Sequence, residues 1–462
     1  MNDETAATRM GRRELLKWAG GAAALAGAGG ALARWKGPML NPFAVETAAA
    51  GAVQAPAPDA AIFMGGTDGW ISLPQGFVTG QTNPLAPYHP DPLAPAPYTD
   101  YIFGFRNLTN LTDTQRSLQK NHAQATAPLF WVRGVDPLAA NPVDFKVSIT
   151  NLGLAQRPDL FDAHTLHWHG FRNVIPFFDG EPTGSVAVPA GSVFTYVYRP
   201  RDPGTYMYHC HVEDVEHVHM GMTGMVFVRP FQNDKWAYND AGTAFDREFS
   251  MMLTEVWAEA HWADAHIQLP EWSDYRPDFS LLNGRVYPDT LVSGAPLDPS
   301  IEPNASTPGL NYLPYVPAQT DANGDLVAPA GRPDLKRQPL SSLVTCNEGD
   351  KVLLRFANLG FKEAAMTLSG MKCRVVGRDA TPMRGRDGTE TSYETNTISM
   401  GAGESCDAIF TAPAHSGGSG PDVYVLSNRN LTRRNGAGPG GQTTEIRVYP
   451  AGTIGTQPYP NY

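Results

Sequence analysis

The stretch His164-Thr-Leu-His167-Trp-His169-Gly170 decides the fold of this chain. On a β-strand successive side chains point to opposite faces, so residues two apart share a face. His167 and His169 therefore share one face of a predicted strand, and His164 points to the other. Buried imidazoles need polar partners, and a metal ion satisfies several of them at once. The spacing indicates a strand with metal ligands on both faces.

A second run, Tyr208-His209-Cys210-His211, shows the same alternation. His209 and His211 share a face, while the Cys210 thiol points the opposite way. Together the two runs predict a sulfur-containing donor group and an imidazole-only donor group on opposite sides of the same strands. The peptide bonds on either side of Cys210 link the two groups covalently.

The first predicted group is a sulfur site, and the loop after Cys210 completes it. Two imidazoles, a thiolate and a weak thioether are the donors that suit an electron-transfer copper. The second is a four-imidazole group, and imidazole alone also suits copper. The sulfur site comprises His164, Cys210, His217 and Met222, with His219 as an alternative ligand, and the four-imidazole group comprises His167, His169, His209 and His211.

These runs, with Phe178-Asp179-Gly180 and Gly204-Thr-Tyr-Met-Tyr, resemble the copper-binding cupredoxin domain of the multicopper oxidases. The resemblance implies that His164, His167 and His169 bind type 1, type 2 and type 3 copper in that order. It also implies that Cys210 binds type 1 copper between two type 3 ligands. The family places its second type 1 histidine five residues after the cysteine, where this chain has Val215. A two-residue insertion makes His217 the expected ligand, with Met222 five residues beyond it.

The resemblance implies a copper-dependent oxidoreductase that accepts single electrons at type 1 copper and passes them through Cys210 to a histidine-bound copper site for oxygen reduction. Predicted catalytic residues are Cys210, His209, His211 and Asp179, whose carboxylate could orient a histidine or pass protons. A non-enzymatic blue-copper carrier or copper-binding protein is the alternative. A copper nitrite reductase is a third reading, but that family has an aspartate in place of His167.

The second half of the chain also resembles a cupredoxin domain, chiefly at Glu348-Gly-Asp-Lys-Val-Leu-Leu-Arg and Thr397-Ile-Ser-Met-Gly-Ala-Gly-Glu. Its metal positions read Ala364-Ala-Met-Thr367-Leu-Ser369-Gly370 instead of histidines. The family reduces dioxygen at a three-copper cluster of eight histidines, four from each of two facing domains, and only four are found here. Three alternatives follow: two subunits complete such a cluster, the four imidazoles form a smaller copper site, or these positions are only partly occupied by metal.

Length and composition predict an all-β protein of two domains. A chain of 462 residues exceeds what one core usually supports. The 46 glycines and 40 prolines fit many short strands joined by turns. We expect two cupredoxin-like Greek-key sandwiches in tandem, at residues 60–232 and 238–462. The net charge of −11 argues against a nucleic-acid partner.

The N-terminal segment resembles an export signal. Arg12-Arg13 and the weakly apolar run Trp18–Ala33 are typical of a twin-arginine signal peptide, predicted at residues 1–33. Residues 34–59 are predicted to be a disordered linker. We therefore expect a periplasmic or secreted protein that has no membrane contact once the signal is removed. Expected partners are a small-molecule or metal-ion electron donor, dioxygen, and further copies of the chain in a dimer or trimer.

Overall fold

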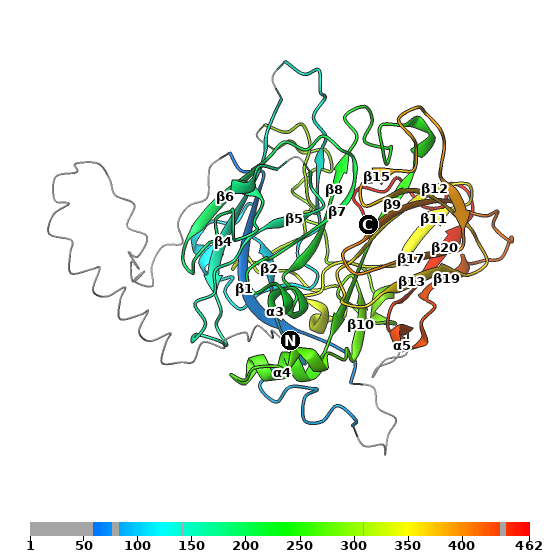
Figure 1. The fold of residues 1–462 in the computed structure, drawn as a ribbon. Coiled ribbons are helices and arrows are strands. Elements are labelled where there is room, and N and C mark those ends of the chain that lie inside the picture. Colours follow the sequence, from blue (N-terminus) through cyan, green and yellow to red (C-terminus); the bar gives the residue numbers. More distant parts are fainter. Residues whose placement is uncertain (1–58, 76–82, 141, 173, 308, 435–439) are drawn as a thin grey trace, which may run out of the picture. The chain divides into compact units, whose positions relative to one another are not determined.

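The computed structural model describes residues 59–75, 83–140, 142–172, 174–307, 309–434 and 440–462. Strands dominate, and the few helices are short (Figure 1). The predicted all-β class is therefore confirmed. The predicted signal peptide, and the predicted linker up to residue 58, lie outside the described residues. In the described part of the chain, no helix is both long and apolar enough to cross a bilayer.

The first sandwich consists of two four-stranded sheets with strand orders β2-β1-β4-β6 and β3-β8-β7-β5. The strands are β1 (Ile62–Ile71), β2 (Asp100–Asn107), β3 (Phe130–Arg133), β4 (Phe145–Gly153), β5 (His167–His169), β6 (Val193–Tyr198), β7 (Gly204–His209) and β8 (Thr223–Arg229). The α-helices in the described part of the chain are α2 (Asp113–Ser117), α3 (Asp214–Met220), α4 (Ala258–Ala265) and α5 (Leu431–Arg434).

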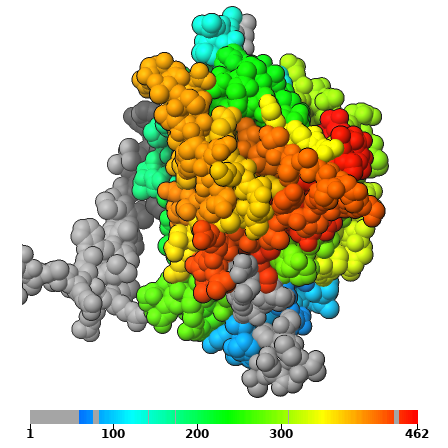
Figure 2. Space-filling view, turned by 90° about the vertical axis from the view of Figure 1, so that its right-hand side faces the viewer, coloured from blue at the N-terminus to red at the C-terminus, as the bar shows by residue number. Residues whose placement is uncertain are grey.

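The second sandwich has one sheet of order β10-β9-β12-β18-β14-β15, with β16 paired to β14, and one of order β11-β20-β19-β13-β17. Its yellow, orange and red residues form most of the face shown in Figure 2. The strands are β9 (Arg247–Val256), β10 (Phe279–Leu282), β11 (Val344–Asn347), β12 (Lys351–Asn358), β13 (Ala364–Leu368), β14 (Cys373–Arg378), β15 (Thr381–Pro382), β16 (Tyr393–Thr395), β17 (Thr397–Met400), β18 (Ser405–Thr411), β19 (Asp422–Asn428) and β20 (Thr443–Tyr449).

The second sandwich repeats the strand order of the first. β2-β1-β4-β6 corresponds to β10-β9-β12-β18, and β3-β8-β7-β5 corresponds to β11-β20-β19-β13. In the first sandwich β5 pairs with β7 so that His167 lies opposite His209. In the second, β13 pairs with β19 and Thr367 lies opposite Ser427. The strands that carry imidazoles in one sandwich therefore carry hydroxyls in the other. The exact domain boundaries stay predictions.

Strand β1 was not expected from the sequence, because three of its ten residues are glycine and glycine weakens a strand. It is nevertheless the inner strand that joins β2 to β4. The glycines allow close packing: a Cβ at Gly69 would lie 2.9 Å from the backbone nitrogen of Ala123. Tertiary packing here outweighs the local propensity.

Candidate metal centre

The four residues of the predicted sulfur site come from three segments at one end of the first sandwich. His164 precedes β5 and is held by paired backbone hydrogen bonds with Val188, of 3.0 and 2.8 Å. Cys210 directly follows β7, and His217 lies on α3. The backbone nitrogen of Cys210 donates to the carbonyl of Met222 at 3.1 Å, which brings the end of the loop back to its start.

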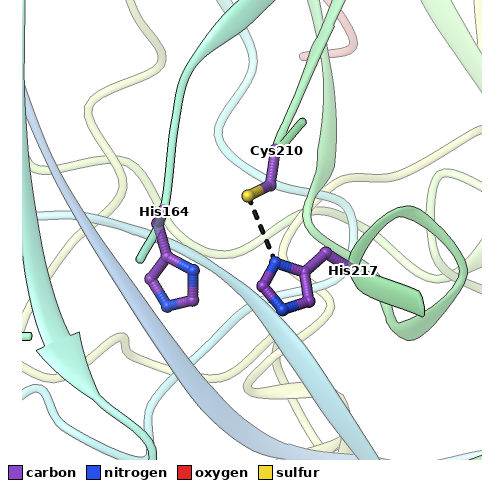
Figure 3. Close-up of side chains that lie close together, drawn as sticks. All are labelled: His164, Cys210 and His217. Atoms are coloured by element: carbon purple, nitrogen blue, oxygen red, sulfur yellow. Dashed lines mark hydrogen bonds between the residues drawn. The ribbon is translucent and has the colours of Figure 1, made fainter. Parts of the chain in front are cut away.

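The side chains of this site converge, as Figure 3 shows for three of them. The Cys210 Sγ lies 3.2 Å from Nδ1 of His217, and the rings of His164 and His217 are 5.3 Å apart between centroids. One donor atom from each of His164, Cys210 and His217 lies within 4.8 Å of the others. Met222 is fully buried beside them. The parity argument for the sulfur site is consistent with this geometry.

One buried imidazole of this site lacks an ordinary partner. His164 is fully buried, yet neither of its ring nitrogens has a hydrogen-bond partner among the described residues. An unpaired buried polar atom is costly, and metal ligation removes that cost. The residues therefore fit a copper ion, for which two imidazoles, a thiolate and a thioether are the preferred soft donor set.

The local electrostatics favour a thiolate at Cys210. Burial alone would raise the pKa of this thiol, but the adjacent rings of His217 and His164 lower it well below its usual range. Burial lowers the pKa of His217. The Cys210 sulfur and the Asp162 carboxylate outweigh burial and raise this pKa to about 10. The thiolate is the form that ligates metals.

Gly66 of β1 makes room for this site. A Cβ at position 66 would lie 2.7 Å from Cδ2 of His164 and 3.4 Å from the terminal methyl of Met222. Contacts under 3.0 Å force a neighbour to move. Gly66 is therefore a site residue that sequence reasoning missed; its signal was the glycine pair Gly65-Gly66 inside a strand.

The four-imidazole group lies on the other side of β5 and β7. The ring of His167 is central: its centroid is 5.2 Å from that of His209, 5.0 Å from that of His211 and 6.2 Å from that of His169. One nitrogen from each of His167, His169 and His209 lies within 4.8 Å of the others. The structure thus brings all four predicted imidazoles together, with three close enough to share one ion.

Two of these rings are oriented by backbone carbonyls. Nδ1 of His167 lies 2.7 Å from the carbonyl oxygen of Asp179, and Nδ1 of His209 lies 2.8 Å from that of Cys210. Because a carbonyl only accepts, each Nδ1 carries the hydrogen and each Nε2 keeps its lone pair. Burial lowers the pKa of His167 and of His169, and lowers that of His209 to about 3. These three rings are neutral at neutral pH, the form that binds metal.

Thr165 connects the two donor groups. Its backbone nitrogen lies 3.5 Å from the Cys210 Sγ, and its hydroxyl accepts a hydrogen bond of 2.8 Å from the backbone nitrogen of His211. One buried threonine thus positions the thiol on one side of the sheet and an imidazole on the other. Sequence reasoning did not single it out.

The second sandwich covers part of the four-imidazole group without contributing an imidazole. A Cβ at Gly403 would lie 3.2 Å from Nε2 of His169. A hollow of about 250 Å³ opens beside His169 and His209, and its other walls are Asp214, Val215, Val218, Leu359, Gly360, Phe361, Ala402 and Gly403. Among the described residues of the second half, no histidine lines this hollow.

His219, the alternative ligand, and two further histidines have other partners. His219 accepts a hydrogen bond of 3.1 Å from the backbone nitrogen of Trp257 and packs against the ring of His261 at 5.0 Å. The side chain of His219 therefore points away from the sulfur site, and the alternative ligand is not supported by the geometry. His266 contacts Asp91 at 2.9 Å, and His415 contacts the carbonyl of Gly420 at 2.7 Å.

Asp179 acts on the four-imidazole group mainly through its backbone. Its carbonyl oxygen orients His167, while its carboxylate Oδ1 lies 3.5 Å from the same Nδ1. A different carboxylate, that of Asp162, lies 3.5 Å from Nε2 of His217. The sequence analysis did not single out Asp162, although its position two residues before His164 was a signal.

Comparison with known proteins agrees with this site. Residues 147–233, which contain both donor groups, match the family model described as multicopper oxidase. The L-ascorbate oxidase of Cucurbita pepo var. melopepo is 28% identical over 156 residues, which is 33% of this chain and 27% of that enzyme. The chain therefore matches about a quarter of the length of that relative.

Two solved structures are similar over most of the chain. The blue copper oxidase from Nitrosomonas europaea has a TM-score of 0.51 and 19% identity, covering 84% of this chain and 85% of its own. The multicopper oxidase mgLAC has a TM-score of 0.52 and 19% identity, covering 86% and 87%. At this identity the likeness shows the fold alone, and it confirms the predicted pair of cupredoxin-like domains.

Proposed function

We propose that this chain, whose first sandwich is of the multicopper oxidase family, is an exported copper-dependent oxidoreductase. It takes single electrons from a reductant at the sulfur site and delivers them to dioxygen at the four-imidazole group. The observation that carries the proposal is that the two donor groups lie next to each other around β5 and β7, with Cys210 between His209 and His211. The export signal rests on the Arg12-Arg13 segment alone.

Copper held by these residues would supply one-electron redox chemistry at the sulfur site and electron transfer to dioxygen at the imidazoles. The chain's own residues set the conditions for both. Full burial of His164, Cys210 and His217 keeps bulk water from the sulfur site. The carbonyl oxygen of Asp179 accepts a hydrogen bond from Nδ1 of His167, and the carbonyl oxygen of Cys210 accepts one from Nδ1 of His209. Nε2 of each ring therefore stays available to bind metal.

The side of His217 away from Cys210 is where a donor would approach. Its Nε2 lies 3.5 Å from the Asp162 carboxylate, and one donor atom from each of Asp162, Glu213 and His217 lies within 4.8 Å of the others. Glu213 is exposed, and Phe161 next to Asp162 is 83% exposed. Two carboxylates and an apolar ring suit a metal cation or a small aromatic reductant, the two donor classes expected from the sequence.

The four-imidazole group supports fewer coppers than a three-copper cluster. A three-copper cluster would need further imidazoles that face this group. Leu359, Phe361 and Gly403 of the second sandwich line the hollow there instead. We therefore propose one copper at the imidazoles and one at the sulfur site. Copper held at the two sites would supply one electron at each, and dioxygen, two electrons and two protons balance to hydrogen peroxide. Asp214, which lines the hollow, and Asp179, whose Oδ1 lies 3.5 Å from Nδ1 of His167, are carboxylates that would pass those protons.

Metal analysis combined with oxygen uptake tests this proposal. We expect two coppers per chain, intense blue colour, and oxygen consumption with ferrous ion or a phenol that yields hydrogen peroxide. His167→Ala should keep the blue colour, because His167 lies outside the sulfur site, but should lose one copper and at least a hundredfold in oxygen uptake. Four coppers per chain with water as the product would contradict the single imidazole copper.

A non-enzymatic blue-copper electron carrier is the second candidate. The absence of facing imidazoles among the described residues of the second half favours it. This candidate predicts one copper per chain and no oxygen uptake. His167→Ala would then change neither the copper content nor the rate at which the sulfur site is reduced.

A further inference from the structure

A cavity of about 130 Å³ lies beside the end of β2, and no residue of either donor group lines it. Its walls combine the segment after β2 with a long segment between β10 and β11. Apolar walls come from Leu129, Ile301 and Leu340, and polar groups from Arg106, Asn110 and Tyr315.

Arg106 is the unusual group in this lining. It is 1% exposed, and within the described residues its guanidinium makes one hydrogen bond, from Nη2 to the carbonyl of Gly324 at 3.0 Å. Its Nε has no partner. Two other fully buried arginines have more partners: Arg355 has Glu248 at 3.1 Å and Asp407 at 3.4 Å, although its Nη2 has none, and Arg285 donates to the carbonyl groups of Gln338 and Val292.

Arg106 forms no ion pair with a carboxylate in the described part of the chain. Asp325 is paired with Arg337 and lies 2.6 Å from Lys336 Nζ. Asp321 lies 3.9 Å from the same Lys336 nitrogen. The two acidic side chains of this loop are therefore paired with other cations. Burial, assisted by Arg337, lowers the pKa of Arg106 to about 9, and an added anion would reverse this effect.

We infer that this cavity binds a small carboxylate with an apolar body, and that Arg106 is the residue that holds its carboxyl group. The guanidinium offers a planar set of donors that matches a carboxylate. An engineered apolar cavity of about 150 Å³ holds benzene, so this space suits a body of one ring or a short branched chain. Asp298 also lines the cavity but accepts hydrogen bonds from Ser300. The carboxyl group is therefore placed at the Arg106 end.

Calorimetric titration of the copper-loaded protein with sodium benzoate tests the inference, with benzamide as the neutral probe of the same shape. We expect saturable benzoate binding and at least tenfold weaker binding of benzamide. Arg106→Gln should weaken benzoate binding at least tenfold, because Gln removes the charge and keeps a donor for Gly324. Ala318→Leu should weaken it as much by filling the cavity with no change of charge.

Arg199→Gln is the matched control, since Arg199 is an exposed arginine paired with Asp144 on the first sandwich. It should bind benzoate as the unsubstituted protein does. Equal binding of benzoate and benzamide, or full binding by Ala318→Leu, would overturn the inference. So would the absence of any benzoate binding beyond that of chloride at equal ionic strength. If Arg106→Gln does not fold, the Ala318→Leu and benzamide comparisons still decide.

Discussion

Cys210 differs from the other three cysteines in what surrounds it. All four are free and buried. Burial raises the pKa of the Cys346 thiol to about 12 and that of Cys373 to about 11, and it also raises the pKa of Cys406. Only Cys210 has imidazoles at its sulfur, and they outweigh the effect of burial. A cysteine becomes a ligand through its neighbours rather than through burial.

Replacing this thiol tests the sulfur site at the level of one atom. Cys210→Ser should abolish the intense blue absorption, because that colour needs a thiolate ligand. Cys346→Ser is the control: its sulfur is buried 3.9 Å from the carbonyl of Arg447 and outside both donor groups, so the colour should persist. Absorption spectra of the two copper-loaded variants give the answer. A blue Cys210→Ser protein would exclude the assignment of this site.

Helix α3 decides which histidine joins the sulfur site. Residues two apart on a helix are separated by about 200° around its axis, so His217 and His219 point in nearly opposite directions. His217 turns toward Cys210, and His219 turns toward Trp257 and His261. The helix packs against β2 and β9, and thus touches both sandwiches. It also accommodates the two-residue insertion that separates Cys210 from its second imidazole.

The end of α3 offers a test at the level of the element. Gly221 has φ +119°, and a Cβ there would lie 2.7 Å from the carbonyl oxygen of Phe103. Gly221→Ala should cost about 1–3 kcal/mol of unfolding free energy through backbone strain alone, and it should shift the adjacent Met222 and alter the blue absorption. Gly417→Ala is the control, since Gly417 has φ +90° and open space at its Cβ. Urea unfolding and absorption spectra should separate strain from steric clash.

The two sandwiches are joined by a buried polar network. Arg355 of β12 reaches Glu248 at 3.1 Å and the Thr205 hydroxyl of β7 at 3.2 Å. Thr205 and Tyr238 both donate to Asp407, at 2.5 and 2.7 Å. Because β7 leads directly into His209 and Cys210, this network anchors the strand that carries both donor groups. The second sandwich therefore supports the site although its own strands carry no metal ligands.

Removing the arginine from this network should weaken the whole molecule. Arg355→Ala leaves the buried carboxylates of Glu248 and Asp407 with less compensation, so the unfolding free energy should fall by about 3–5 kcal/mol. Arg199→Ala removes an exposed arginine and should change the stability little. Denaturant unfolding of the copper-free variants isolates this effect from metal binding. Equal stability of the two variants would show that the network does not hold the sandwiches together.

The sequence by itself determined the fold class and the division of the donors into two groups. Both follow from strand parity, which is a local property of the backbone: His167 and His209 meet across β5 and β7 as alternation requires. It also predicted the loss of ligands in the second half, seen where Thr367 lies opposite Ser427.

Only the tertiary structure decided the remaining features, because each depends on contacts between distant segments. The direction in which the side chains of His217 and His219 point depends on the position of α3 against β2 and β9. The position of Gly403 beside His169 depends on how one sandwich packs on the other. The lack of an ion-pair partner for Arg106 among the described residues depends on the folded loop in which Arg337 pairs with Asp325. The periodicity of a local sequence does not predict contacts between distant segments, because those contacts depend on how whole elements pack.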